Sequence, residues 1–276
     1  MCRWMAYLGG SMRMHDLLFE PKNNLIDQSL SSRSAETPTN GDGFGVGWYG
    51  NWKFPGVYRS IRPAWNDFNL RDLALNVESM AFMAHVRATS LATVQETNCH
   101  PFRYRNWLFV HNGEIFEVEK FRRELLMAVD PKYFENILGS TDSELMFHLA
   151  LTFGLEQNPV EAMAKMVALV EQTGKAKNVP ESMWMTIGLS DGKTLWGFRY
   201  ASDGNAPTLF HSRDKKELIE INPALQNRFS DKDRILVSEP VGKFQEAWVE
   251  VPQGSSLIIH DGNIDIKPFQ PLDFTT

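Results

Sequence analysis

The sequence contains few cysteines and no long apolar run. Only Cys2 and Cys99 occur in 276 residues, so no disulfide framework is expected. No stretch approaches the ~18 consecutive apolar residues of a membrane-spanning helix. Gly9-Gly10, Arg13 and Asp16 interrupt the region where a secretory signal would lie. We therefore expect a cytoplasmic protein that makes no use of a membrane.

Several motifs with defined chemistry are also missing. The glycine-rich segment 40–49 fits neither G-x-G-x-x-G nor a Walker pattern, which argues against a phosphate cradle. C-x₂-C and H-E-x-x-H are absent. The net charge of −6 argues against nonspecific binding of nucleic acid, which needs a positive surface. We expect no metal, no cofactor and no nucleic-acid partner. A metal site built from His85, Cys99, His100 and His111 is an alternative, although adjacent Cys99 and His100 are poorly spaced for chelation.

What the chain does contain is typical of a folded globular protein. Hydrophobic residues make up 43% and charged residues 22%. Strand-like runs lie at both ends of the sequence and helical patterns lie between them, which predicts an α+β fold with two sheets and helices packed outside. Neither an internal repeat nor a linker is visible. We therefore expect residues 1–276 to form a single domain.

Apolar runs and capping residues predict the individual elements. Strands are expected at 3–8, 80–86 and 107–110, at the glycine-rich segment 40–49, and at 183–189, 194–200, 209–211, 235–237, 248–251 and 257–259. Residues 11–40 are expected to be mostly loop, and 116–129 to be helical. Further helices are expected after Asn66, after Thr141, which forms a capping box with Glu144, and after Asn158.

Cys2 is the residue around which a function can be built. A cysteine in the second position is small enough for Met1 to be removed, which makes Cys2 the mature N-terminus. Its thiolate is a strong nucleophile, and its new α-amine has a pKa near neutral and can act as the base. On position alone, the ordinary interpretation is favoured, in which Cys2 is a small apolar residue that opens a strand.

Further polar clusters lie at the ends of predicted elements, where functional groups concentrate. They are H-x-R at 85–87, N-x-H-P-F at 98–102, H-N-G-E at 111–114 and T-D-S-E at 141–144. Taken singly, each has an ordinary explanation as a structural histidine, a turn or a helix cap. Taken in this order after Cys2, they resemble the class II glutamine amidotransferases, which are N-terminal-nucleophile (Ntn) hydrolases. The segments M-C-R-W-x-A-Y and G-D-G-F-G-V-G-W-Y look most like a stand-alone bacterial subgroup.

The resemblance implies a four-layer αββα sandwich with two mostly antiparallel sheets. It also implies that Cys2 attacks the amide of glutamine and forms a γ-glutamyl thioester. The Asn112 side-chain amide and the Gly113 backbone N–H would then stabilise the oxyanion.

The resemblance implies a substrate-binding group as well. Arg87 would bind the α-carboxylate of glutamine and Asp142 its α-ammonium. Relatives often carry threonine where this chain has Ser90, with Thr89 just before it, and either hydroxyl is a candidate to face the substrate. His100 would support the pocket from behind.

Two other functions remain open. Relatives that hydrolyse γ-glutamyl amides in ergothioneine synthesis and glutathione breakdown use the same chemistry on another substrate. A non-catalytic Ntn-fold binding protein would retain the pocket without the reaction. A separate acceptor or synthase subunit is a candidate partner, and the oligomeric state is not predicted.

Overall fold

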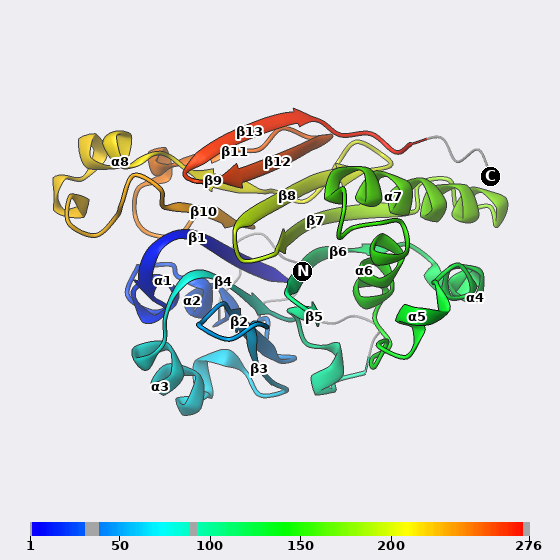
Figure 1. Cartoon of the computed structure of the whole chain (residues 1–276), viewed down its shortest axis with the longest axis horizontal. Helices are drawn as coiled ribbons and strands as arrows, with labels where there is room; N and C mark the ends of the chain where they lie inside the picture. The colour runs from blue at the N-terminus through cyan, green and yellow to red at the C-terminus, as the bar shows by residue number, and fades with distance from the viewer. Residues whose placement is uncertain (1, 31–38, 89–92, 273–276) are drawn as a thin grey trace.

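The computed structural model of the chain describes residues 2–30, 39–88 and 93–272. Its strands form two sheets in which every pairing between described strands is antiparallel (Figure 1). Among these residues no helix is both long and apolar enough to cross a bilayer.

The first sheet has seven strands in the order β11-β9-β10-β1-β4-β2-β3. Their bounds are β1 (Arg3–Arg13), β2 (Phe44–Trp48), β3 (Gly56–Ser60), β4 (Glu78–Val86), β9 (Phe210–Ser212), β10 (Arg234–Val237) and β11 (Trp248–Glu250). We call it sheet A. The first strand of the chain therefore lies in the middle of sheet A, between β10 and β4.

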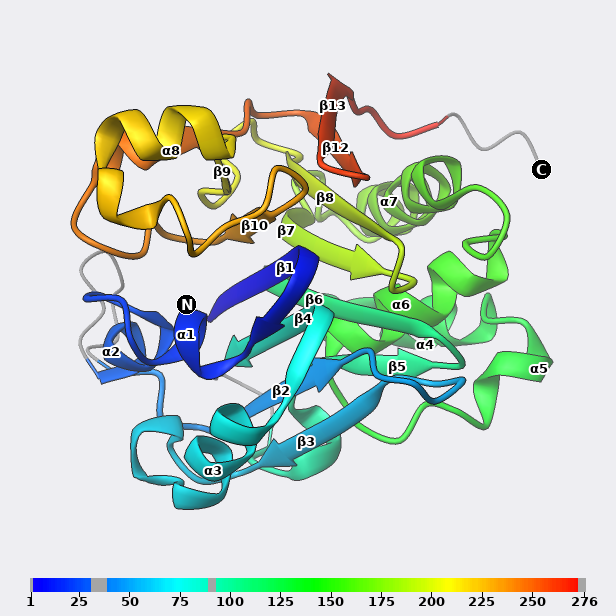
Figure 2. The same cartoon turned by 60° about the vertical axis from the view of Figure 1, so that its left-hand side comes forward.

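The second sheet, sheet B, has six strands in the order β13-β12-β8-β7-β6-β5. Their bounds are β5 (Phe102–Tyr104), β6 (Trp107–Ile115), β7 (Met183–Ser190), β8 (Thr194–Ala201), β12 (Ser255–His260) and β13 (Asn263–Pro268). Figure 2 shows α1, α2 and α3 on one side of the molecule and α4, α6 and α7 on the other. The helices are α1 (His15–Leu18), α2 (Leu25–Leu30), α3 (Phe68–Asn76), α4 (Arg122–Met127), α5 (Pro131–Phe134), α6 (Asp142–Thr152), α7 (Pro159–Ala176) and α8 (Lys215–Ile221).

Three apolar clusters separate four layers. One lies between sheet B and the helices α4 to α7, and a second lies between sheet A and the helices α1 to α3. The third fills the space between the two sheets and includes Trp4, Met83, Val110, Leu236 and Leu257. The order helix, sheet, sheet, helix confirms the predicted α+β sandwich of four layers.

Residues 11–40 differ from the prediction of a loop. β1 continues past Gly9 to Arg13, and α1 and α2 follow it. The two glycines do not end the strand: they let it pass Asp233, whose side chain a Cβ on Gly9 would overlap and whose carboxylate accepts the Gly10 N–H at 2.7 Å. In the sequence alone, glycines that allow such a close approach look the same as glycines that end a strand.

The helix starts were predicted with mixed success. Thr141 and Asn158 cap α6 and α7 as predicted, by accepting the N–H of the residue three positions later. However, Glu144 does not complete a capping box, because its carboxylate accepts the N–H groups of Leu138 and Gly139. Asn66 is not a cap either: Asp67 accepts the Leu70 N–H at 2.7 Å.

Candidate active site

Alternation along three strands brings the predicted site residues to one place. Trp4 on β1, Met83 on β4 and Val110 on β6 all face the space between the sheets. Side chains alternate with a period of two, and Cys2 lies two residues before Trp4, Arg87 four after Met83, and Asn112 two after Val110. These three side chains therefore face the same space. Arg3 pairs with Val86, so the start of β1 lies beside the end of β4. The Cys2 Sγ accordingly lies 3.4 Å from the Ala88 carbonyl oxygen.

The Cys2 thiol is half-buried. Burial raises its pKa, while the bond to the Ala88 carbonyl and the nearby charges of Arg87 and Arg3 act in the opposite direction. Arg3 also donates to the Cys2 carbonyl at 2.9 Å and pairs with Glu239, which holds the start of the strand. A thiol with a raised pKa is mostly neutral near pH 7, so it needs a base to become a nucleophile.

Arg87 is buried just beyond the end of β4. Its N–H donates to the Gly43 carbonyl at 2.8 Å, and its own carbonyl accepts the Asp42 N–H at 3.0 Å. Its Nη1 lies 3.4 Å from both the Asp42 and the Thr93 carbonyl oxygens. The guanidinium is therefore held by backbone next to the nucleophile.

Asn112 and Gly113 lie inside β6, whereas the sequence placed them after the end of a strand. The strand continues to Ile115, which pairs with Met183. Asn112 is only 3% exposed, and within the described ranges no hydrogen bond engages its side-chain amide. The apolar run stops at Val110 because the next inward-facing position, Asn112, lines the site rather than the core. The amide is thus buried with its hydrogen-bonding capacity unused.

Gly113 adopts a φ of +147°, which is unfavourable for residues with a side chain. A Cβ at this position would also overlap the Trp184 carbonyl oxygen of the neighbouring strand. A side chain at this position would therefore be strained and would collide with the neighbouring strand.

Asp142 is the first residue of α6 and lies against the end of β6. Its Oδ2 accepts the Ile115 N–H and its Oδ1 accepts the Ser143 N–H, both at 2.8 Å. A carboxylate has further lone pairs, so these bonds leave acceptor capacity for an ammonium group. Ser90 and Thr89 lie outside the described residues.

Asn98, known from the sequence only as part of a motif, connects the two substrate-binding candidates. Its amide donates to the Thr93 carbonyl, which Arg87 approaches, and its carbonyl accepts the Ser140 N–H just before Asp142. No local pattern predicts this bridge, because Asn98 and Ser140 are 42 positions apart.

His100 lies behind this group, between the sheets. Its ring stacks on that of His85 with centroids 4.1 Å apart, and neither of its ring nitrogens has a hydrogen-bond partner among the residues that the structure describes. Burial lowers the pKa of both rings, to about 3 for His85. The glycines of β2 make room for this segment: a Cβ on Gly45 would overlap the His100 carbonyl oxygen. The absence of a side chain at Gly45 thus allows the backbone at His100 to approach β2 closely.

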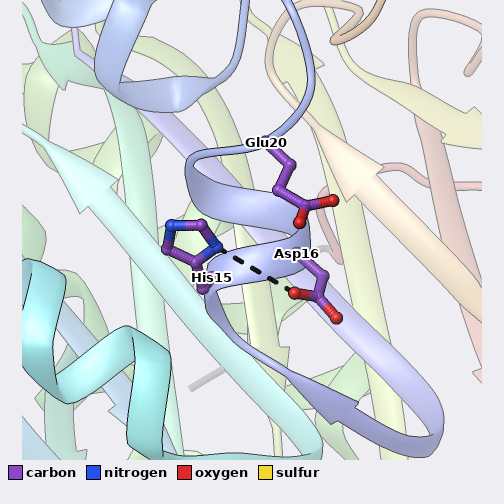
Figure 3. A group of neighbouring side chains, drawn as sticks. All are labelled: His15, Asp16 and Glu20. Carbon is purple, nitrogen blue, oxygen red and sulfur yellow. Dashed lines mark ion pairs between the residues drawn. The ribbon is translucent and has the colours of Figure 1, made fainter.

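The structure does not assemble the alternative metal site. Among the described residues, the group of potential ligands close enough to share an ion is His15, Asp16 and Glu20, shown in Figure 3. Asp16 already pairs with Arg13 at 2.9 Å and Glu20 with Arg228 at 2.7 Å, so we interpret the group as an ion-pair network. It lies beyond the far end of β1 from Cys2, beside a cleft of about 1350 Å³ that contains none of the predicted site residues.

Comparison with known proteins identifies the family. The family model described as "Glutamine amidotransferases class-II" matches residues 22–273, which include Arg87, Asn112, Gly113 and Asp142. "Probable glutamine amidotransferase DUG3" of Saccharomyces cerevisiae is 31% identical over 97% of this chain and 84% of its own length. A "Gamma-glutamyl-hercynylcysteine sulfoxide hydrolase" of Mycolicibacterium smegmatis is 30% identical over 41% of this chain and 51% of its own.

Solved structures share the fold. A glutamine aminotransferase class-II domain protein from Silicibacter pomeroyi superposes with a TM-score of 0.76 and 32% identity, and the match covers 99% of this chain and all of that one. The glutamine phosphoribosylpyrophosphate amidotransferase of Bacillus subtilis superposes with a TM-score of 0.64 over 98% of this chain and 49% of its own, at 14% identity. The motifs, the fold and the family match agree, and the chain is an enzyme that belongs to the class II glutamine amidotransferases of the Ntn-hydrolase superfamily.

Proposed function

We propose that the protein hydrolyses the side-chain amide of glutamine, or a related γ-glutamyl amide, through a thioester on Cys2. The observation that carries this proposal is the convergence of Cys2, Arg87 and Asn112 at one end of the space between the sheets, with Asp142 beside the end of β6. The site combines a nucleophile, a cation, an amide donor and an anion. Hydrolysis of a zwitterionic amide requires these four groups: one to attack, one to stabilise the oxyanion and two to bind the charged ends of the substrate.

The reaction begins with removal of Met1, which frees the Cys2 α-amine. The amine accepts the thiol proton, and the thiolate attacks the γ-carbonyl carbon. The Asn112 amide and the Gly113 N–H stabilise the resulting oxyanion. The protonated amine then donates its proton to the departing nitrogen, so ammonia leaves and the thioester forms. Water attacks the thioester and releases glutamate and the free thiol.

The amino-acid end of the substrate is held by opposite charges. The planar guanidinium of Arg87 suits a carboxylate, which it can bind through two parallel hydrogen bonds. Asp142 suits the α-ammonium. We assign a hydroxyl contact to Ser90 or Thr89, and we assign His100 to support behind the pocket.

A second candidate substrate is the γ-glutamyl amide of a thiol metabolite. The similarity to the gamma-glutamyl-hercynylcysteine sulfoxide hydrolases of Mycolicibacterium smegmatis and Mycobacterium tuberculosis supports this candidate. The match spans about half the length of each of those relatives. If glutamine is the substrate, the ammonia would pass to a separate acceptor subunit or be released. We further propose that the chain acts as a single glutaminase domain. We also propose that it acts in the cytoplasm, where its two free cysteines would stay reduced.

Intact mass spectrometry with diazo-oxo-norleucine, an electrophilic glutamine analogue, tests the proposal. Met1-processed protein should gain one adduct on Cys2, and a form with an N-terminal tag left in place should gain none. Cys2→Ala should also remain unmodified. Processed, reduced wild-type protein that gains no adduct would contradict the mechanism. Ammonia release from a panel of γ-glutamyl amides then identifies the preferred substrate.

A further inference from the structure

The proposed site is divided between the two sheets. Cys2 and Arg87 directly adjoin β1 and β4 of sheet A, whereas Asn112 and Gly113 lie within β6 of sheet B. Most of the contact between the sheets is apolar, through residues such as Met83, Leu108 and Leu236. Apolar contact stabilises without direction, so it alone does not set how one sheet is placed relative to the other.

His85 makes a directional contact across this layer. It lies on β4 two residues before Arg87, and its Nε2 is 3.0 Å from the His111 carbonyl oxygen on β6. Because a carbonyl only accepts, Nε2 carries the hydrogen and donates it. The acceptor belongs to the peptide bond that leads directly into Asn112.

A second directional contact reaches the other side of the same residue. Trp4, two residues after Cys2, donates from its indole N–H to the Thr186 hydroxyl at 3.3 Å. That hydroxyl lies 3.5 Å from the Asn112 carbonyl oxygen. The carbonyls on both sides of the Asn112 α-carbon are therefore linked to sheet A, by His85 directly and by Trp4 through Thr186.

We propose that His85 is a positioning residue that sets the distance between the nucleophile of sheet A and the oxyanion donors of sheet B. The inference rests on the proposed function of that site. The surroundings of the ring suit the task, since its edge is bonded to His111 and its face is stacked on His100. His85 touches no reacting atom: it acts through the peptide that carries Asn112.

The test compares His85→Phe, which keeps a flat ring but removes the donor, with His85→Gln, whose amide nitrogen can donate from a similar depth. We expect His85→Phe to lower kcat for glutamine hydrolysis about tenfold to a hundredfold, because small displacements of oriented groups have effects of this size. The KM for glutamine should change by less than about threefold, and His85→Gln should restore most of kcat. Rates are expressed per active site, as counted by the diazo-oxo-norleucine adduct, so that unfolded protein does not contribute.

His148→Phe is the matched control. His148 is also a buried histidine bonded to a backbone carbonyl, that of Glu144 at 2.8 Å, but the bond lies within α6 and does not join the sheets. It should cost stability without changing kcat. Alkylation of Cys2 by iodoacetamide, which needs no oxyanion site, should proceed at the wild-type rate in His85→Phe.

Each outcome has a distinct meaning. Wild-type kcat in His85→Phe would overturn the inference and leave the proposed function intact. An equal loss in His85→Gln and His85→Phe would overturn it too, because the donor would not be the cause. A wild-type protein that forms no adduct and releases no ammonia would instead refute the proposed function itself.

Discussion

Replacing Asn112 by alanine should remove activity while leaving the fold almost unchanged. The side chain is 3% exposed and, in the part of the chain that the structure describes, forms no hydrogen bond through its amide, so its removal breaks no internal bond. We therefore expect the free energy of unfolding to change by about 1 kcal/mol or less. In the transition state, the same amide would donate to the oxyanion. Loss of one such donor costs about 2.7–4 kcal/mol, or about 10²–10³ in kcat.

The assay is ammonia release from glutamine at saturating substrate, with urea unfolding measured on the same samples. Asn158→Ala is the opposite control: its side chain caps α7 by accepting the Glu161 N–H, so it should lose about 1 kcal/mol of stability and keep its kcat. Asn112→Asp has nearly the same shape but no donor when ionised, and it should lose at least as much activity as Asn112→Ala. A kcat for Asn112→Ala within about threefold of wild type would refute the assignment of the oxyanion site.

Three further predictions follow from the same region. The pKa of His85 is about 3 in the folded protein and about 6.5 when unfolded, so the unfolded chain binds more protons between these values. The free energy of unfolding should thus fall as pH drops below 6.5, and a protein equally stable to urea at pH 7 and pH 5 would contradict this. Gly45→Ala should lower the thermal midpoint because its Cβ overlaps the His100 carbonyl, whereas Gly50→Ala, with open space around it, should not. Arg87→Lys should raise the KM for glutamine about tenfold or more, because an ammonium cannot bind both carboxylate oxygens in a fork, and an unchanged KM would remove Arg87 from the binding site.

Local signals in the sequence predicted the elements whose cause is local. Asn158 and Pro159 start α7 as expected, since a cap and a proline act on the helix that they begin. The apolar runs before Arg87 and Asn112 did predict strands. Strands without an apolar run were missed, such as β13, whose residues are mostly exposed at the edge of sheet B. The helix α8 was also missed, although Asp214 and Glu217 form a capping box that was visible in the sequence.

The candidate site was likewise predicted only in part. The sequence named Cys2, Arg87, Asn112 and Asp142 through the order of their motifs, but it placed Asn112 after the end of a strand rather than within it. A strand that continues into a functional site loses its apolar pattern there, because the inward-facing side chain must serve the substrate instead of the core. His85 was visible as part of a motif, but its bond to the His111 carbonyl and the bond from Trp4 to Thr186 were not predictable from the sequence.

The sequence by itself therefore determined which chemical groups are present, their order and the family to which they belong, because residue types and spacings are properties of the chain. Only the tertiary structure decided that the strand after Cys2 and the strand that carries Asn112 lie in different sheets, and that His85 and Trp4 make hydrogen bonds between those sheets. Those contacts join strands of two different sheets, and their distances depend on how the sheets pack rather than on any neighbouring residue.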